Sequence, residues 1–121
     1  MTDQSATPAN FLVLMADEHN PKFLGCAGHD LVKTPNLDAL AARGTRFTSA
    51  YTNSPICVSA RASLATGRYV HEHQCWDNAI AYEGTPDSWA HKLRETGHPV
   101  TSIGKLHYYS DDVPGGFDKQ M

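Results

Sequence analysis

The hydrophobic residues of this chain gather in short runs that are separated by glycine, proline and polar residues. The longest run is "FLVLMA", residues 11–16, and it has no polar residue at alternate positions. Continuous apolar runs of this length are typical of strands buried on both faces of a parallel sheet. The sequence "PVTSIG" (residues 99–104) and the segment 46–51 predict two further strands, of which the second is short.

Between these strands the sequence contains start and stop signals for helices. Thr34 is a good N-cap, Pro35 suits the first helical turn, and Gly44 suits the exit. They predict a helix over the segment "NLDALAAR". Small residues predict a second helix over residues 60–66, which ends at Gly67.

A third helix is predicted where the same entry signal recurs. Thr85 and Pro86 open a segment that contains Trp89, Ala90 and Leu93, and Gly97 marks its end.

Strands that alternate with helices over long crossovers imply a parallel sheet. We therefore expect an α/β layered fold with a mostly parallel central sheet and helices on both faces. The chain contains no repeat, and we expect residues 1–121 to form part of one domain without an internal boundary. Ligands of such sheets bind beyond the carboxyl ends of the strands, where Asp17, Glu18, Lys105 and His107 lie.

Composition and charge narrow the possible classes of protein. The 121 residues are 40% hydrophobic and 19% charged, with a net charge of −3, which gives no indication of a nucleic-acid surface. The polar start lacks the basic segment of a secretory signal, and the run at 11–16 is too short to span a membrane. Cys26, Cys57 and Cys75 show no disulfide framework. We expect a cytoplasmic protein with reduced thiols and no nucleic-acid or membrane partner.

The last residues, "VPGGFDKQM", contain no pattern that would close a sheet. We therefore expect this chain to be the front part of a longer protein, and to need the C-terminal remainder for activity.

Asp17 and Glu18 are candidate ligands of a hard cation, because carboxylates at a strand end can bind Ca²⁺ or Mg²⁺. The alternative is that Asp17 caps a turn, which is common at strand ends.

Cys57 stands before the helix predicted over residues 60–66, followed closely by Ser59 and Arg61. A helix N-terminus favours an anionic substrate, and a guanidinium group binds sulfate or phosphate through planar donors. The alternative is that Cys57 is a small core residue. The spacing of Cys57 and Arg61 is too short for the phosphate-cradling loop of a thiolate phosphatase.

The sequence "CVSARASLATG", residues 57–67, resembles the signature of type I sulfatases of the alkaline-phosphatase superfamily. Ser59 fills a position where that family more commonly has proline. "NFLVLMADEHN" resembles the first strand and metal-binding acid of the family, and "KTPNLDALAARGTRFTSAYTNSPIC" the segment before its modified cysteine. "GHPVTSIGKLHY" resembles its second signature.

This resemblance implies a sulfatase fold and the hydrolysis of a sulfate ester. It implies that Cys57 is converted to Cα-formylglycine by a formylglycine-generating enzyme, and that the hydrated aldehyde attacks sulfur and then expels sulfate. It also implies a divalent cation, Ca²⁺ in preference to Mg²⁺ or Mn²⁺, held by Asp17, by Glu18 and by modified Cys57. Further ligands would come from the C-terminal remainder.

The same resemblance assigns residues to the sulfate. Arg61 and Lys105 would offset its charge, and Lys105 and His107 would hold it. Asn78, in "CWDNA", resembles an active-site asparagine of choline-sulfatase-like and phosphonate-hydrolase-like members. His73 follows Gly67 in a predicted loop, where we expect a surface residue that can also line the substrate pocket.

Two alternatives to a sulfatase stay open. A phosphonate monoester or phosphodiester hydrolase of the same superfamily shares the modified cysteine, although its relatives tend to have uncharged residues at "GKLH". A non-catalytic fragment is the second alternative, if the polypeptide truly ends at Met121. The sequence identifies neither the organic part of a sulfated substrate nor the oligomeric state, and homo-oligomerisation stays open.

Overall fold

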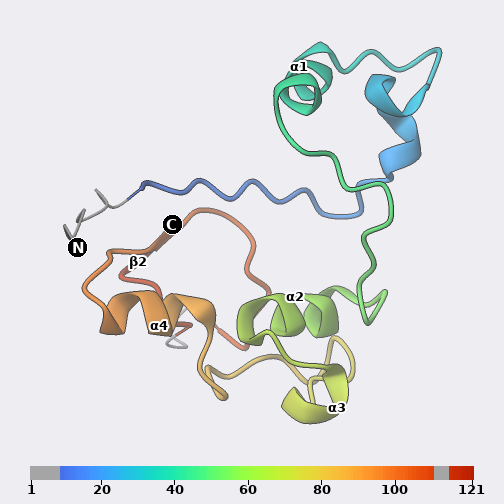
Figure 1. Cartoon of the computed structure of the whole chain (residues 1–121). Coiled ribbons are helices and arrows are strands. Elements are labelled where there is room, and N and C mark those ends of the chain that lie inside the picture. The colour runs from blue at the N-terminus through green and yellow to red at the C-terminus, as the bar shows by residue number, and fades with distance from the viewer. Residues whose placement is uncertain (1–8, 111–114) are drawn as a thin grey trace, which may run out of the picture. The chain divides into compact units, whose positions relative to one another are not determined.

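A computed structural model describes residues 9–110 and 115–121 (Figure 1). The chain divides into two compact units, Met1–Phe47 and Thr48–Met121. In chain order the elements are the 3₁₀ helices η1 (Pro21–Phe23) and η2 (Gly25–Ala27), the helices α1 (Pro35–Arg43), α2 (Cys57–Thr66), α3 (Val70–His73) and α4 (Trp89–Glu95), and the strands β1 (Thr101–Ser102) and β2 (Lys119–Gln120).

In the first unit, a hydrogen-bond network joins η2 to the start of α1. The carboxylate of Asp38 on α1 accepts hydrogen bonds from the Cys26 amide at 2.7 Å and from the Thr34 hydroxyl at 2.9 Å. The Thr34 hydroxyl also accepts a hydrogen bond from the Gly25 amide at 2.8 Å. The bond from the Cys26 amide lowers the pKa of Asp38. The helix predicted from Thr34, Pro35 and Gly44 is confirmed.

The strand predicted over residues 11–16 is wrong for this structure. The segment has no regular secondary structure, and the side chains of Phe11 and Leu12 are 90% and 82% exposed. A strand needs a neighbouring strand to satisfy its backbone groups, and the described residues of the first unit provide none. The short strand predicted over residues 46–51 is also absent.

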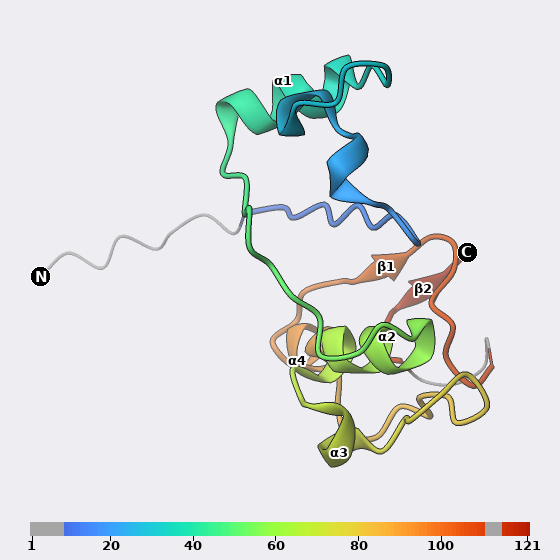
Figure 2. The ribbon, with the colours of Figure 1, turned by 90° about the vertical axis from the view of Figure 1, so that its right-hand side faces the viewer.

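In the second unit, β1 and β2 form a two-stranded parallel sheet in which Thr101 pairs with Lys119 (Figure 2). The strand predicted within residues 99–104 is therefore present, although shorter than expected. The two strands are parallel, as the fold prediction requires.

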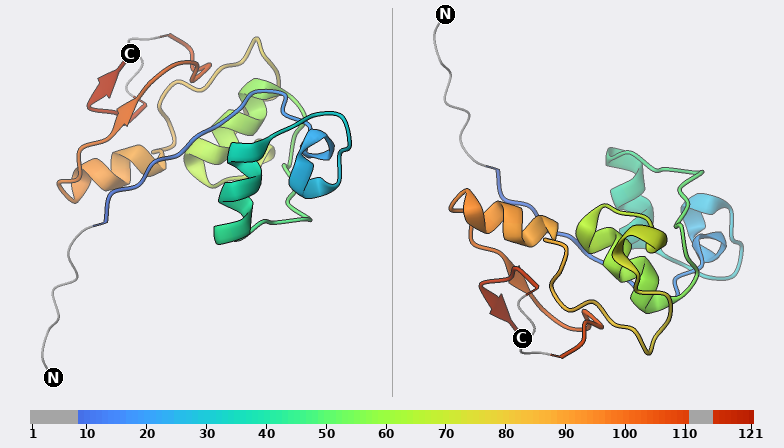
Figure 3. Two further views of the ribbon diagram at one scale, coloured as in Figure 1. Left: turned by 90° about the horizontal axis from the view of Figure 1, so that it is seen from above. Right: turned by 90° about the horizontal axis from the view of Figure 1, so that it is seen from below.

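The core of this unit is built around one face of α2. Val58, Ala62 and Ala65 lie on that face, and they pack with Cys75 and Tyr82. Their small side chains allow neighbouring segments to approach, and α2 contacts both α3 and α4 (Figure 3). The ring of Tyr82 meets the ring of Tyr108 edge to face at 4.9 Å, and burial raises the pKa of each to about 12.

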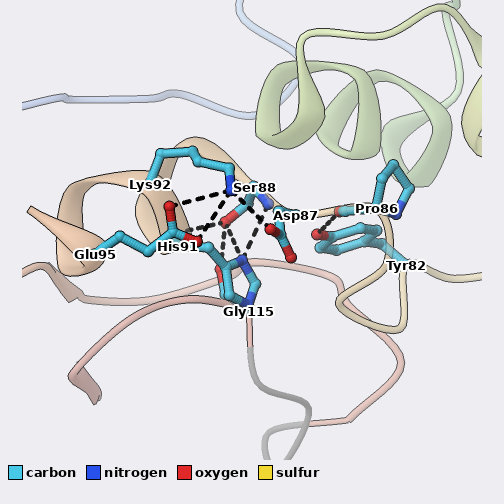
Figure 4. Close-up of polar contacts among 8 residues, drawn as sticks. All are labelled: Tyr82, Pro86, Asp87, Ser88, His91, Lys92, Glu95 and Gly115. Carbon is cyan, nitrogen blue, oxygen red and sulfur yellow. Dashed lines mark hydrogen bonds and ion pairs between the residues drawn. The ribbon is translucent and has the colours of Figure 1, made fainter.

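Helix α4 begins at Trp89, so the start predicted at Thr85 and Pro86 is wrong. The carbonyl of Pro86 accepts a hydrogen bond from the Tyr82 hydroxyl and so contributes to tertiary packing. Ser88 is the N-cap instead: its hydroxyl accepts from the His91 amide at 3.3 Å and donates to the Gly115 carbonyl at 2.6 Å (Figure 4).

A glycine is required where the C-terminal segment meets α4. Gly116 has φ +92°, and a Cβ atom there would lie 2.3 Å from the His91 nitrogen. None of the helices in residues 9–110 and 115–121 has the length and apolarity needed to cross a membrane.

Candidate functional site

Cys57 is the first residue of α2, so this helix begins at Cys57 rather than at Ala60, the predicted start. The N-cap residue, Ile56, has no side chain that can satisfy the free amides of the first turn. Asn78 performs this role from another segment. Its Oδ1 accepts hydrogen bonds from the Val58 amide and from the Cys57 Sγ, each at 3.2 Å.

Arg61 lies one turn after Cys57 on the same helix. Its Nη1 donates a hydrogen bond to the backbone carbonyl of Lys105 at 2.5 Å. The helix that carries Cys57 is thereby tied to the loop that follows β1. The structure thus brings Cys57, Asn78, Arg61 and Lys105 together within one unit.

The loop that carries Lys105 and His107 is held at both ends. The Gly104 amide donates to the Met121 carbonyl at 2.7 Å, and the Tyr109 amide donates to the Tyr82 carbonyl at 3.0 Å. His107 has φ 60°, a left-handed conformation that costs free energy in a residue with a side chain. Its Nδ1 is buried and has no hydrogen-bond partner among the described residues.

Ser59, which fills the middle position of the motif, is completely buried. Its Oγ likewise makes no hydrogen bond within the described part of the chain. This side chain therefore faces the interior of the unit, whereas Cys57 is half-buried.

His73 is buried, with only 7% of its surface exposed, so the predicted surface position is wrong. It ends the one-turn helix α3, where a loop was predicted. Its Nε2 lies 2.8 Å from the Ser63 hydroxyl on α2, and its Nδ1 accepts a hydrogen bond from the Cys75 amide at 3.1 Å. Burial lowers the pKa of His73. Its role in substrate binding stays a prediction.

Asp17 and Glu18 belong to the first unit and form a turn directly after residues 11–16. Glu18 has the left-handed φ of 54°. Within residues 9–110 and 115–121 no three acidic, histidine or cysteine side chains form a group that could hold a metal ion. These residues alone therefore do not fit a complete divalent-cation site, and the metal assignments of Asp17, Glu18 and Cys57 stay predictions.

Comparison with known proteins identifies the family. The family model described as "Sulfatase" matches residues 9–120, and the chain belongs to this family. The prediction made from the motif at residues 57–67 is thereby confirmed.

Individual relatives agree with this assignment. The chain is 37% identical over 112 residues to a choline-sulfatase of Rhizobium meliloti (strain 1021), covering 93% of this chain and 22% of that protein. It is 34% identical over 109 residues to an N-acetylglucosamine-6-O-sulfatase of Bacteroides thetaiotaomicron, covering 90% of this chain and 19% of the relative. The chain thus spans about a fifth of the length of these relatives.

A solved structure supports the fold. The structure of BT4656 in complex with its substrate D-glucosamine-2-N,6-O-disulfate matches with a TM-score of 0.75 and 33% identity, covering 86% of this chain and 21% of that one. The fold is therefore sulfatase-like. The described residues contribute a two-stranded parallel sheet and helices to it, and the full layered sheet with helices on both faces stays a prediction.

Proposed function

We propose that the protein to which this chain belongs hydrolyses a sulfate ester, with residue 57 at the reaction centre. The observation that carries the proposal is the joining of Cys57, Asn78, Arg61 and Lys105 around the start of α2. The family membership of the chain supports it.

The start of α2 suits an anionic substrate. The first amides of a helix have no partners inside the helix and carry partial positive charge. Conversion of Cys57 to formylglycine would supply, through the hydrated aldehyde, an oxygen nucleophile at this position. The Oδ1 of Asn78 lies against the side chain of residue 57 and the Val58 amide, so Asn78 limits the orientations open to residue 57.

The cationic side chains would offset the charge of the sulfate. Arg61 brings a guanidinium group to α2, and its bond to the Lys105 carbonyl fixes the loop that carries Lys105 and His107. Donors held in place before the reaction stabilise developing negative charge without a cost of reorganisation. We assign Lys105 and His107 to sulfate binding.

A divalent cation, with Ca²⁺ preferred, stays part of this proposal, and we assign Asp17, Glu18 and modified residue 57 to its ligands. Ca²⁺ takes six or more oxygen ligands. The relatives extend well beyond the matched fifth, and the missing ligands would come from that portion.

The test compares two substrate classes with the full-length protein. We expect a higher kcat/KM for an aryl sulfate than for the matching aryl phosphonate monoester, because Lys105 and His107 both offer donors to a sulfate oxygen. Peptide mass spectrometry should find formylglycine or its hydrate at position 57. Cys57→Ala should abolish turnover, whereas Cys26→Ala, in the other unit, should not.

A clear preference for the phosphonate would assign the protein to the phosphonate monoester hydrolases instead. An unmodified thiol at position 57 in fully active enzyme would exclude the nucleophile named here.

A further inference from the structure

Two contacts fasten the segment between α3 and Asn78 to α2. At one end, Asn78 accepts hydrogen bonds from the Cys57 side chain and the Val58 amide. At the other end, His73 meets the hydroxyl of Ser63, further along the same helix, at 2.8 Å. Helix α3 lies beside α2 in two views (Figures 1 and 3), and the two helices are in contact.

The hydrogen bonds of His73 define its tautomer. The Cys75 amide can only donate, so the Nδ1 that it meets at 3.1 Å must carry a lone pair. In a neutral ring the proton is then on Nε2, which donates to the Ser63 hydroxyl. Burial lowers the pKa of His73 and so favours this neutral form.

Two residues of the segment between the contacts are constrained. Gln74 ends α3 in the left-handed conformation, with φ 61°. Cys75 is 4% exposed and packs in the core with Val58 and Ala62. Because Cys75 anchors this short segment in the core, we expect a displacement of His73 to shift Asn78 as well.

We propose that His73 is a positioning residue: its bond to Ser63 anchors the segment that carries Asn78, and this sets the place of Asn78 against residue 57. This inference rests on the proposed function, because it takes residue 57 as the reaction centre. In this proposal His73 supports the site from within the protein and does not contact the substrate. Both of its ring nitrogens already face protein groups.

The first test uses three variants of the full-length enzyme. Ser63→Ala removes only the hydroxyl, and His73→Asn keeps an acceptor near the Cys75 amide but cannot reach Ser63. We expect both to lower kcat/KM on the aryl sulfate by about tenfold, the effect of losing one buried hydrogen bond. His73→Gln places an amide donor near the position of Nε2 and should recover most of the activity.

The matched control is His71→Asn. His71 lies on the same short helix but is exposed and stacks on Tyr69 with ring centroids 5.9 Å apart. This variant should keep the activity of the wild type. An equal loss in His71→Asn, or no loss in Ser63→Ala, would overturn the proposal.

The second test asks whether the effect passes through Asn78. In an Asn78→Ala background, Ser63→Ala should add no further loss, because the group to be positioned is gone. A full additional loss would show that Ser63 and His73 act in another way.

A third measurement does not depend on activity. Hydrogen exchange of the peptide that contains the Val58 amide should become faster in Ser63→Ala and in Asn78→Ala, and stay unchanged in His71→Asn. If the wild type hydrolyses no sulfate ester, the proposed function fails. The exchange rates still decide whether His73 and Ser63 position Asn78.

Discussion

At the scale of single residues, Arg61 makes one contact that depends on the shape of its cationic group. Its guanidinium reaches the Lys105 carbonyl from α2, and it lies one turn from Cys57. A guanidinium presents several donors in a rigid plane, whereas an ammonium group is a compact point charge on a flexible stem. Charge alone would therefore not hold the loop.

We expect Arg61→Lys to lower kcat/KM of the full-length enzyme on an aryl sulfate by about 10- to 100-fold, although the net charge is unchanged. Arg68→Lys is the control, because Arg68 is exposed and its backbone makes the hydrogen bonds seen for it, with Thr66 at 3.3 Å and Asn53 at 3.4 Å. Wild-type activity in Arg61→Lys would mean that only the charge of this side chain matters.

The sequence predicts single residues when they lie in a local motif, but not when their role depends on a tertiary contact. Cys57, Arg61 and Lys105 could be predicted because each lies in a motif of a few neighbouring residues. The contact between Ser63 and His73 could not, because it joins two helices through a turn whose path depends on packing. The position of His73 after Gly67 predicted an exposed residue in a loop, but the structure buries its side chain at the end of α3.

At the scale of elements, helices α1, α2 and α4 could be predicted because their signals are local. The starts of α2 and α4 could not be predicted in this way, because tertiary groups help to set them: Asn78 extends α2 back to Cys57, and Ser88 delays the start of α4. The apolar run at residues 11–16 has the pattern of a strand, but a strand forms only when non-local partners are present.

The capping of α4 can be tested at Ser88. Its buried hydroxyl joins the His91 amide to the Gly115 carbonyl (Figure 4). Ser88→Ala removes the cap and leaves a buried carbonyl without its donor, so we expect a loss of about 1–2 kcal/mol in the free energy of unfolding. Denaturant unfolding of the full-length protein measures it.

Asp87→Asn is the matched control for Ser88→Ala. The Asp87 carboxylate pairs with Lys92 at 2.9 Å, but both side chains are more than half exposed. Exposed ion pairs contribute little to stability, so this variant should unfold close to the wild type. An effect in Asp87→Asn as large as that in Ser88→Ala would mean that the cap is not the main stabilising contact here.

At the scale of the whole molecule, the apolar residues at 11–15 are the most informative surface. Phe11, Leu12, Val13 and Leu14 are all largely exposed in the described structure. Contiguous apolar side chains of this kind normally pack against another part of a protein or a partner. The relatives are about five times as long as the matched segment, and the continuous run is typical of a strand covered on both faces.

The coverage of this run can be tested with two adjacent substitutions in the full-length protein. Successive side chains of a strand point to opposite faces. If both faces are covered, Leu12→Asp and Val13→Asp should each bury an unpaired charge and lower the denaturation midpoint and the soluble yield strongly. Leu31→Asp is the control, since Leu31 is equally exposed but lies in a turn outside any apolar run.

If only one of the two adjacent variants is destabilised, the run is covered on one face only. If neither is, the run is a surface segment in the whole protein, and the central strand of the sulfatase fold must be sought elsewhere in its sequence.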